Sequence, residues 1–389
     1  MILVLNCGSS SLKFCLFDPK LNKLVDGIFE RVGSSNSFCE FKKDGVKNKF
    51  EKSFLSHKDC LVFLFEKLKE YGIDTSSIKI IGHRVVHGGD FNDSVLVDDA
   101  ILEKMDIVSS LAPLHNPVQI SVIRACVELF PDIKNAISFD TAFHSTIPNF
   151  AYTYAIPIEL SEKHSIRRYG FHGLSHEFVM KEYAKKIGKD VTDLNLITCH
   201  LGSGSSICAI KNGRSVDTSM GFTPLEGLVM GTRGGDMDPS IPLFLAKKEG
   251  LTLEEIDNIF NKKSGLVGLT GMNNIDMREV LYLAGYPVSD FDGAHLDKKY
   301  NSGELALLKK KCKLAIDVFV YRVKKYIGSY YAILGRVDAI IFMAGIGERS
   351  QTIRELITSD LKILKNTPVE VIPTNEEKMI AEEAGIFNK

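Results

Sequence analysis

The sequence predicts an α/β protein that contains the same structural unit twice. Residues 2–17 have the pattern of an apolar strand, a turn of small polar residues and a second apolar strand. Residues 194–210 repeat this pattern with a turn rich in glycine and serine. Between the two copies, apolar residues show the spacing of amphipathic helices. Two strand–turn–strand copies within an α/β pattern indicate a duplicated domain.

Helices are expected where apolar residues recur every three or four positions along the chain. Residues 61–68 follow this spacing, and a longer apolar stripe runs through residues 308–323. Asn116 is a suitable N-cap before Pro117, which favours the first position of a helix. Packing in a core accounts for these periodic apolar residues.

A third apolar run, at 337–343, is followed by AGIGE at 344–348. This pattern predicts a buried strand that ends in a glycine-rich turn. With 389 residues, the chain exceeds the usual size of a single hydrophobic core, so at least two domains are expected. No linker of low complexity marks their boundary, which we predict near residue 142, before the polar segment that holds Ser145 and Pro148.

The charge balance and the cysteine pattern exclude several classes of protein. Lysine and arginine total 48 against 49 aspartate and glutamate residues, so no excess of positive charge favours binding to nucleic acid or to a membrane surface. No apolar run reaches the ~20 residues of a membrane span. The eight cysteines have irregular spacing and no C-x-x-C pair, as is typical of reduced thiols. We therefore expect a cytoplasmic protein.

The two polar turns are candidates for phosphate binding, because serine- and glycine-rich turns expose several backbone N–H groups in one concavity. Two such turns predict a nucleotide held between two domains, although a pair of hairpins without a ligand has the same pattern. A P-loop is excluded because no G-x-x-x-x-G-K-[ST] occurs, and no complete dinucleotide-binding fingerprint is present. His172 and His176 have the spacing of a helical metal pair, but further zinc ligands are missing.

Two arginines, Arg84 and Arg233, lie among glycines and small residues, unlike arginines on a solvated helix face. Their planar donors suit a carboxylate or a phosphate, and a structural arginine that binds loop carbonyls is the alternative. Asp140, His172 and His200 lie among aromatic or apolar neighbours. Each is a candidate for chemistry or, alternatively, a hydrogen-bonded residue of the core.

Taken together, these segments closely resemble the acetate kinase family. The resemblance rests on LNCGSSSLKF at 5–14, GHRVVHGG at 82–89, LAPLHNP at 111–117, RYGFHG at 168–173, MGTR at 230–233 and AGIGE at 344–348. These motifs occur in the order of the family and cover almost the whole chain.

The resemblance implies two duplicated RNase H-like domains of the actin-like ATPase type, with a nucleotide cleft between them. It predicts an N-terminal domain of residues 1–142 plus 377–389 and a C-terminal, nucleotide-binding domain of residues 143–376. It also implies a homodimer and the reversible transfer of the ATP γ-phosphate to acetate, which gives ADP and acetyl phosphate. The expected cofactor is Mg²⁺, with Mn²⁺ as an alternative.

The resemblance assigns catalytic roles to residues that match the family motifs. Arg84 and Arg233 resemble the arginines that hold the carboxylate and the phosphoryl group in transfer. His172 resembles the histidine that stabilises the transition state. Asp140 matches an essential aspartate, either a proton donor or a positioning group. In-line transfer to a carboxylate needs little base catalysis and much neutralisation of charge, which these groups and Mg²⁺ would supply.

The same resemblance predicts the binding residues. Asn6 and Glu376 look like magnesium-site residues, and Lys13 looks like an ATP-contacting residue. The expected contacts with the phosphates and the adenosine are His200, Leu201, Gly202, Ser203, Gly204, Asp276, Met277, Arg278, Gly345, Ile346, Gly347, Glu348 and Arg349.

Four positions match residues around the acetate methyl group in the family: Val86, Leu114, Phe171 and Pro224. Their bulk predicts that propionate is a poorer substrate and not an excluded one, because one methylene discriminates by only ~1–3 kcal/mol. Ser203 and Arg349 replace asparagines that are usual in the family, which leaves the nucleotide preference open. Cys7 beside Asn6 is expected to be a buried, inert thiol, with an oxidant-sensitive site as the alternative.

Other functions remain open at this point. Propionate or butyrate kinase is the nearest alternative, although the compact pocket disfavours butyrate. An actin-like or chaperone-like module that couples nucleotide hydrolysis to conformational change is a second, and an ATP-binding pseudoenzyme is a third. Trapping of an acyl phosphate would separate the kinases from the other two.

Overall fold

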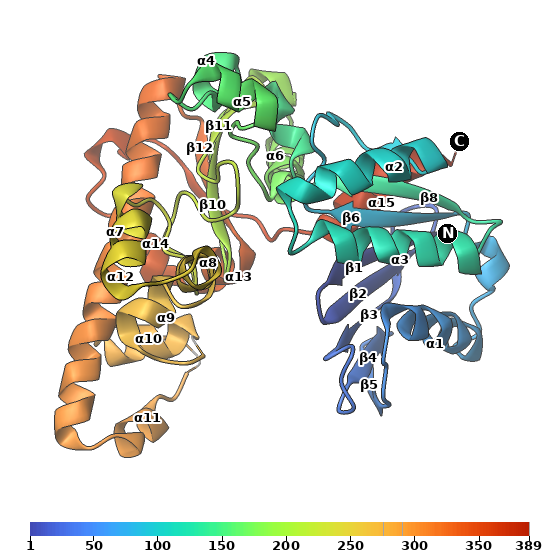
Figure 1. Cartoon of the computed structure of the whole chain (residues 1–389), viewed down its shortest axis with the longest axis horizontal. Coiled ribbons are helices and arrows are strands. Elements are labelled where there is room, and N and C mark those ends of the chain that lie inside the picture. The colour runs from blue at the N-terminus through green and yellow to red at the C-terminus, as the bar shows by residue number, and fades with distance from the viewer. Residues whose placement is uncertain (275, 290, 389) are drawn as a thin grey trace. The chain divides into compact units, whose positions relative to one another are not determined.

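The computed structural model describes residues 1–274, 276–289 and 291–388, and its chain divides into two compact units (Figure 1). Unit 1 comprises Met1–Ser145, Gly173–Phe178 and Asn375–Lys389. Unit 2 comprises Thr146–His172 and Val179–Thr374. The domain boundaries expected from the sequence stay a prediction, and residue 389 at the end of the segment 377–389 lies outside the described residues.

Unit 1 contains an eight-stranded sheet of order β5-β4-β3-β2-β1-β6-β8-β7. Strand β1 is antiparallel to β2 and parallel to β6, and β6 is parallel to β8. The strands are β1 (Ile2–Gly8), β2 (Ser11–Phe17), β3 (Lys23–Glu30), β4 (Phe38–Lys43), β5 (Val46–Glu51), β6 (Ile80–Val85), β7 (Val95–Leu96) and β8 (Lys134–Phe139).

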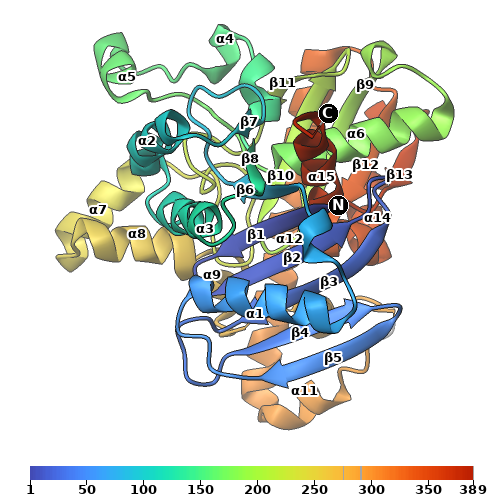
Figure 2. The ribbon, with the colours of Figure 1, turned by 90° about the vertical axis from the view of Figure 1, so that its right-hand side faces the viewer.

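Alternation along the strands gives the sheet of unit 1 two different faces. Leu3 and Leu5 of β1 belong to a buried cluster with residues of α1 (His57–Glu70) and α3 (Asn116–Leu129). Figure 2 shows α1 lying across the strands β2, β3 and β4. The other face is covered by α15 (Glu376–Ile386), and a Cβ on Gly82 would lie 2.7 Å from Ile380 of that helix. Because side chains alternate along β1 and β6, those of Asn6 and Arg84 lie on the face that α15 covers.

Phenylalanines fill the core between α1 and the strands. The rings of Phe14 and Phe41 are 4.7 Å apart between centroids, and Phe29 and Phe54 meet edge to face at 5.0 Å. The helix itself begins with a capping box formed by Ser56 and Asp59, and it contains the periodic apolar residues at 61–68. The predicted helix is therefore confirmed. Unit 1 also contains α2 (Asp99–Val108) and the first turn of α6 (Gly173–Ile187).

Unit 2 repeats the central part of this sheet. Its five strands follow the order β11-β10-β9-β12-β13, where β9 is antiparallel to β10 and parallel to β12, and β12 is parallel to β13. This is the arrangement of β3-β2-β1-β6-β8 in unit 1, so the predicted duplication and the α/β fold class are confirmed. The strands are β9 (Asn195–Leu201), β10 (Ser205–Lys211), β11 (Arg214–Thr218), β12 (Ala339–Met343) and β13 (Val369–Val371).

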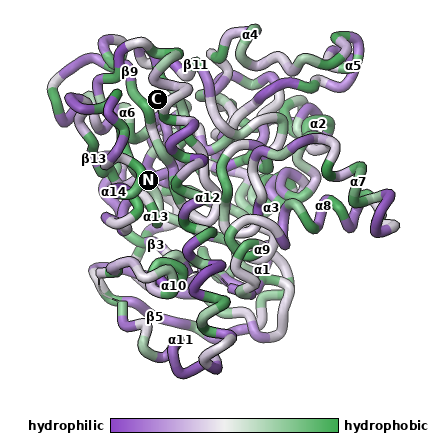
Figure 3. The backbone as a smooth tube through the Cα atoms, turned by 90° about the vertical axis from the view of Figure 1, so that its left-hand side faces the viewer, coloured by the Kyte–Doolittle hydropathy of each residue, from purple (hydrophilic) through white to green (hydrophobic). Residues whose placement is uncertain are grey.

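The helices of unit 2 include one of 33 residues, α12 (Ser302–Leu334), which begins at a capping box of Asn301 and Glu304. Its buried residues include Leu308, Cys312 and Phe319, as the apolar stripe predicts. Figure 3 shows hydrophobic and hydrophilic stretches alternating along α12. The other helices of this unit are α4 (Asn149–Tyr152), α5 (Ile158–His164), α7 (Ser240–Glu249), α8 (Leu253–Lys262), α9 (Gly265–Thr270), α10 (Met277–Leu283), α11 (Ala294–Lys299), α13 (Ala344–Arg349) and α14 (Gln351–Thr358).

Two local predictions are wrong. Asn116 is not the N-cap of α3, because the helix begins one residue earlier and His115 holds the cap position. The side chain of Asn116 instead binds both backbone polar groups of His87. Residues 344–348 are not a turn but most of the short helix α13, in which Ala344 adopts a left-handed φ of 63°. None of the helices in the described part of the chain combines the length and hydrophobicity that a membrane crossing requires.

Two buried histidines make the stability of the fold depend on pH. Burial lowers the pKa of His83 and of His87 to about 4, although His83 also bonds to Asn135. An unfolded histidine titrates near 6.5, so between pH 6.5 and 4 only the unfolded chain takes up these protons. We expect the free energy of unfolding to be highest above pH 6.5 and to fall by roughly 3 kcal/mol per histidine towards pH 4.

Urea unfolding at a series of pH values from 7.5 to 4.5 tests this prediction. His83→Gln should flatten the dependence on pH relative to the unaltered chain. The exposed His164 offers a matched control, and His164→Gln should leave the slope unchanged. A slope that is the same in all three proteins would contradict the assignment.

Candidate active site

The expected site residues of unit 1 lie where parallel strands end. Asn6 lies near the end of β1, Arg84 near the end of β6, and Asp140 directly after β8. Ligands of α/β proteins commonly bind at the carboxyl ends of parallel strands. Glu376, the first residue of α15, joins the same cluster because α15 covers this face of the sheet.

Arg84 is the centre of this cluster. Its Nε and Nη2 donate to the two carboxylate oxygens of Asp140 at 2.9 and 2.6 Å, a bidentate pair. Its Nη1 donates to Asn6 Oδ1 at 3.3 Å, and Nε lies 3.6 Å from Glu376 Oε2. Burial alone would lower the pKa of Arg84, but the carboxylates of Asp140 and Glu376 outweigh it and raise the pKa. The guanidinium is thus a permanent, fixed positive charge.

The residues expected to hold Mg²⁺ fit that ion. Asn6 and Glu376 both offer side-chain oxygens to the same guanidinium of Arg84, so they lie in one small region. Glu376 Oε1 also accepts from Ser175 Oγ at 2.8 Å, which fixes the carboxylate. Mg²⁺ prefers oxygen ligands and commonly takes one or two protein groups together with waters and substrate phosphates. Within the described residues no group of three or more His, Cys, Asp or Glu side chains could hold a metal alone.

Buried side chains fix the loop that follows Arg84. Gln119 accepts from the backbone N–H of Val86 at 3.0 Å, and Thr141 Oγ1 accepts from that of Gly88 at 3.0 Å. Val86 is buried, whereas Leu114 is 55% exposed within this structure. Gln119 and Thr141 were not predicted, since an isolated glutamine or threonine has no sequence signature.

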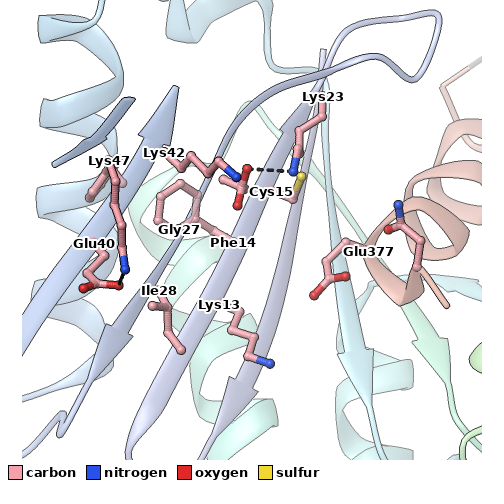
Figure 4. Close-up of a pocket in the computed structure, with 13 residues that line it drawn as sticks. Lys13, Phe14, Cys15, Lys23, Gly27, Ile28, Glu40, Lys42, Lys47 and Glu377 are labelled. Carbon is pink, nitrogen blue, oxygen red and sulfur yellow. Dashed lines mark ion pairs between the residues drawn. The ribbon is translucent and has the colours of Figure 1, made fainter. Parts of the chain in front are cut away.

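Lys13 lies on β2 opposite Asn6 of β1, so both side chains are on the same face of the sheet. It lines a cavity of about 330 Å³ in unit 1, together with Glu377 from the start of α15 (Figure 4). Two ion pairs cross the cavity wall, Lys23 with Asp26 at 2.8 Å and Lys47 with Glu40 at 2.6 Å. This mixture of opposite charges has no clear preference for an anion beyond Lys13 itself.

In unit 2, His172 is held in an unusual conformation at the start of α6. Its backbone has a left-handed φ of 58°, which is rare for a residue with a side chain and is often found at functional sites. The ring stacks on His200 with centroids 4.0 Å apart, and Nδ1 lies 2.9 Å from Ser206 Oγ. These two contacts hold the imidazole ring in place.

Gly204, in the turn between β9 and β10, lies beside both His172 and Arg233. A Cβ at this position would lie 3.4 Å from His172 Nε2 and 3.8 Å from Arg233 Nη1. The structure therefore brings these two expected catalytic side chains together around one glycine. Phe171, which precedes His172, is buried.

Arg233 has weak protein partners. Its Nη1 lies 3.5 Å from the carbonyl oxygen of Pro224 and 3.9 Å from Met230 Sδ, and no carboxylate of the described residues pairs with it. Burial lowers its pKa from the usual value. A partly buried guanidinium without a protein anion is suited to bind an anionic ligand.

A cavity of about 660 Å³ in unit 2 begins at the same turn. This volume is in the usual range for small-molecule sites. Arg278 and Arg349 lie in its wall, and among the residues that the structure describes only Arg278 has a carboxylate partner, Asp276. The remaining positive charge favours a phosphorylated ligand. Of the expected nucleotide contacts, its wall contains Gly202, Ser203, Asp276, Met277, Arg278, Gly345, Ile346 and Arg349.

The other expected nucleotide contacts lie outside this wall. His200, Leu201 and Gly204 belong to the strand and turn behind it. Gly347 is buried, and Glu348 accepts from the backbone N–H groups of Ala344 and Thr374. Glu348 thus holds helix α13 against the segment before α15.

Several wall residues of this cavity were not predicted. They are mainly apolar or small side chains without a motif, and neither periodicity nor spacing distinguishes them from core residues. They are Gly231, Leu266, Leu281, Pro287, Val288, Ser289, Ser350, Gln351 and Thr352.

The structure also bears on the rejected metal pair and on the cysteines. His172 contacts Ser206 and His200, whereas the ring of His176 packs against His144, so the two histidines have different neighbours. All eight cysteines are free and buried. Burial raises the pKa of Cys7 to about 12, which favours the expected inert thiol over an oxidant-sensitive site.

Comparison with known proteins agrees with these features. Residues 1–286 and 295–366 match the acetokinase family. The curated acetate kinase of Dictyoglomus thermophilum is 47% identical over 412 residues, covering 98% of both chains, and that of Thermoanaerobacter pseudethanolicus is 46% identical over 411 residues, covering 98% of this chain and 97% of the relative.

Solved structures agree as well. A propionate kinase from Francisella tularensis has a TM-score of 0.87 and 42% identity, covering 98% of both chains. The acetate kinase of Porphyromonas gingivalis has a TM-score of 0.87 and 37% identity, covering 100% of this chain and 99% of that chain.

The fold and these relatives define the class: a kinase with the duplicated actin-like ATPase fold. Within that class, the chain belongs to the acetokinase family.

Proposed function

We propose that the protein is an acetate kinase, which transfers the γ-phosphate of ATP reversibly to acetate and forms acetyl phosphate and ADP. The observation that carries the proposal is the environment of Gly204, where His172 and the guanidinium of Arg233, which pairs with no carboxylate of the described residues, lie beside the turn that leads into the larger cavity. That environment suits a phosphoryl group in transfer.

In this proposal, Arg84 and Arg233 hold the carboxylate and the phosphoryl group. Each guanidinium offsets the repulsion between acetate and the phosphoryl oxygens, which is the main barrier to attack by an anion. His172 donates to an equatorial oxygen as negative charge moves during transfer. Asp140, already bound to Nε and Nη2 of Arg84, acts as the group that positions Arg84.

Asn6 and Glu376 would hold Mg²⁺, and the ion would neutralise charge on the phosphates. Ser175 fixes Glu376 for this role, and Arg84 keeps Asn6 directed to the same region. The cavity beside Ser203 and Gly345 would hold the rest of ATP, with Arg349 near its phosphates or ribose. Lys13 would contact the phosphates.

Propionate is the second candidate substrate, because a propionate kinase structure shares 42% identity with the chain. We expect acetate to be preferred, since Val86, Phe171 and Pro224 would surround a small methyl group. Discrimination of about 10-fold in kcat/KM matches one methylene. Butyrate should be poorer still.

Trapping of the acyl phosphate with hydroxylamine tests the function and ranks the substrates. Purified protein with ATP and Mg²⁺ should form hydroxamate fastest from acetate, more slowly from propionate and least from butyrate. A higher kcat/KM for propionate than for acetate would reassign the substrate. ATP hydrolysis without hydroxamate would favour a module driven by nucleotide hydrolysis.

The proposal extends to a cytoplasmic homodimer. Apolar side chains of unit 2 are exposed on two helices, Leu243 and Phe244 on α7 and Leu307, Leu314 and Tyr321 on α12. Burial of such side chains against a second copy would stabilise a dimer. Sedimentation of the purified protein at the mass of one chain over the micromolar range would contradict it.

A further inference from the structure

Residues 219–239, all of which the structure describes, form neither helix nor strand between β11 and α7. This segment carries Pro224 and Arg233, which the proposed function places at the substrate. A segment without regular structure needs other contacts to hold a catalytic side chain in place.

One arginine binds the beginning of this segment. Arg168 Nη1 donates to the carbonyl oxygens of Thr218, Ser219 and Met220 at 2.8, 3.3 and 3.1 Å, and Nη2 donates to Glu226 Oε1 at 2.6 Å. The backbone N–H of Arg168 is itself bound to the carbonyl of a residue in α4, so the arginine is fixed. A single guanidinium thus joins the end of β11 to Glu226, eight residues further along the chain.

Glu226 is held from a second side. Its Oε2 accepts from the hydroxyl of Tyr154, which in turn accepts from the backbone N–H of Phe222 at 2.9 Å. There is no space for a side chain at Gly221, where a Cβ would lie 1.6 Å from Glu226 Oε2 and 2.2 Å from the Tyr154 oxygen. The segment is therefore closed tightly around the Glu226 carboxylate.

Gly227, the residue after Glu226, begins the turn that carries Arg233. The N–H of Gly227 donates to Asp236 Oδ1 at 2.8 Å, and the N–H of Asp236 donates to the Gly227 carbonyl at 3.0 Å. Tyr326 of α12 donates to Asp236 Oδ2 at 2.8 Å. Residues 227–236 therefore form a closed loop, and one side of its base is Glu226.

From these contacts we propose that Arg168 is a positioning residue, which acts through Glu226 to hold the loop that presents Arg233 and the carbonyl of Pro224. The inference rests on the proposed function. Arg168 itself contacts neither of these groups. Its fork serves three carbonyls and a carboxylate at once, a geometry that a lysine ammonium cannot reproduce.

The experiment compares Arg168→Lys, Arg168→Met and Glu226→Gln with the unaltered protein. We expect both Arg168 variants to raise KM for acetate at least 10-fold and to lower kcat at least 10-fold. KM for ATP and the affinity for ADP should stay within threefold of the values for the unaltered protein. Glu226→Gln should shift the same two quantities by about fivefold, because the amide oxygen can still accept from Arg168 whereas the amide NH2 cannot accept from Tyr154 and the charge is lost. If Arg168→Lys does not restore KM and kcat, the planar geometry of the guanidinium is needed and not its charge alone.

Arg336→Met is the matched control, since Arg336 also pairs with an aspartate and a carbonyl in unit 2 but lies outside this segment. It should behave as the unaltered protein. Thermal unfolding and calorimetric titration with ADP, which need no turnover, accompany every variant. If the Arg168 variants do not fold, Glu226→Gln decides.

Any of three results with the Arg168 variants would overturn the inference: kcat/KM for acetate within threefold in Arg168→Met, full rescue by Arg168→Lys, or loss of ADP affinity in step with the change in acetate KM. A change within twofold for Glu226→Gln would do the same. Absence of acyl phosphate from the unaltered protein with any carboxylate would instead refute the proposed function.

Discussion

Replacement of Arg84 by methionine should abolish acyl phosphate formation, with kcat/KM for acetate reduced at least ~10³-fold. The variant loses the fixed positive charge of the unit 1 cluster. It also leaves the carboxylates of Asp140 and Glu376 without the guanidinium between them. Loss of one partner from a buried ion pair costs ~3–5 kcal/mol, so the free energy of unfolding should fall as well.

Hydroxamate formation and urea unfolding measure the two effects separately. Arg84→Lys keeps the charge but not the bidentate pair with Asp140, and it should recover stability more than activity. Arg124 also pairs with an aspartate in unit 1 but is half-exposed, so Arg124→Met provides the control, with both quantities close to those of the unaltered protein. Activity of Arg84→Met within 10-fold of the unaltered protein would refute the role of Arg84.

Replacement of His172 by alanine is expected to lower kcat by ~10²–10³-fold, the usual cost of one donor to a transition state. KM for acetate and for ATP should change little, because the contact forms mainly as charge develops during transfer. Equal loss in kcat and kcat/KM is the kinetic sign of a group that acts in the transition state. Steady-state kinetics with both substrates varied measures it.

The left-handed backbone of His172 gives this prediction a second comparison. His172→Asn retains a residue that tolerates this conformation, so it separates loss of the imidazole from strain at the start of α6. It should be as inactive as alanine but more stable. His164→Ala, at an exposed histidine of the same unit, should be fully active. A His172→Asn variant with more than a tenth of the original kcat would contradict the role.

The sequence predicts the strands and the duplicated sheet because strands have a simple pattern. The apolar runs of β1, β9 and β12 are continuous, as expected for strands buried on both faces. Helix ends are harder to predict, as Asn116 illustrates. Its side chain is a good cap in isolation, but the buried backbone of His87 binds it instead. A tertiary contact thus outweighed a local preference.

Some features of the candidate site can likewise be predicted from the sequence and others cannot. Glycine-framed arginines and the turn at Gly204 are visible in the sequence because their composition is unusual. The groups that fix them are not, since Gln119, Ser175 and Ser206 are ordinary polar residues. Their contacts come from strand alternation and from segments distant in sequence, which one sequence does not reveal. Here the resemblance to a family identified side chains that could act, and the structure identifies what holds them.

The placement of α15 has a consequence for how the chain folds. This helix comes from the last residues of the sequence, yet it covers β1 and β6, and Gly385 packs against Ile2. During synthesis on the ribosome, one apolar face of the first sheet must remain uncovered until residues 376–386 have emerged, long after β1 and β6. Contacts of such long sequence separation slow folding and expose partly folded chains to aggregation. The step that completes the fold of unit 1 is also the one that delivers Glu376, so a partly synthesised chain would lack both a covered sheet and a complete site.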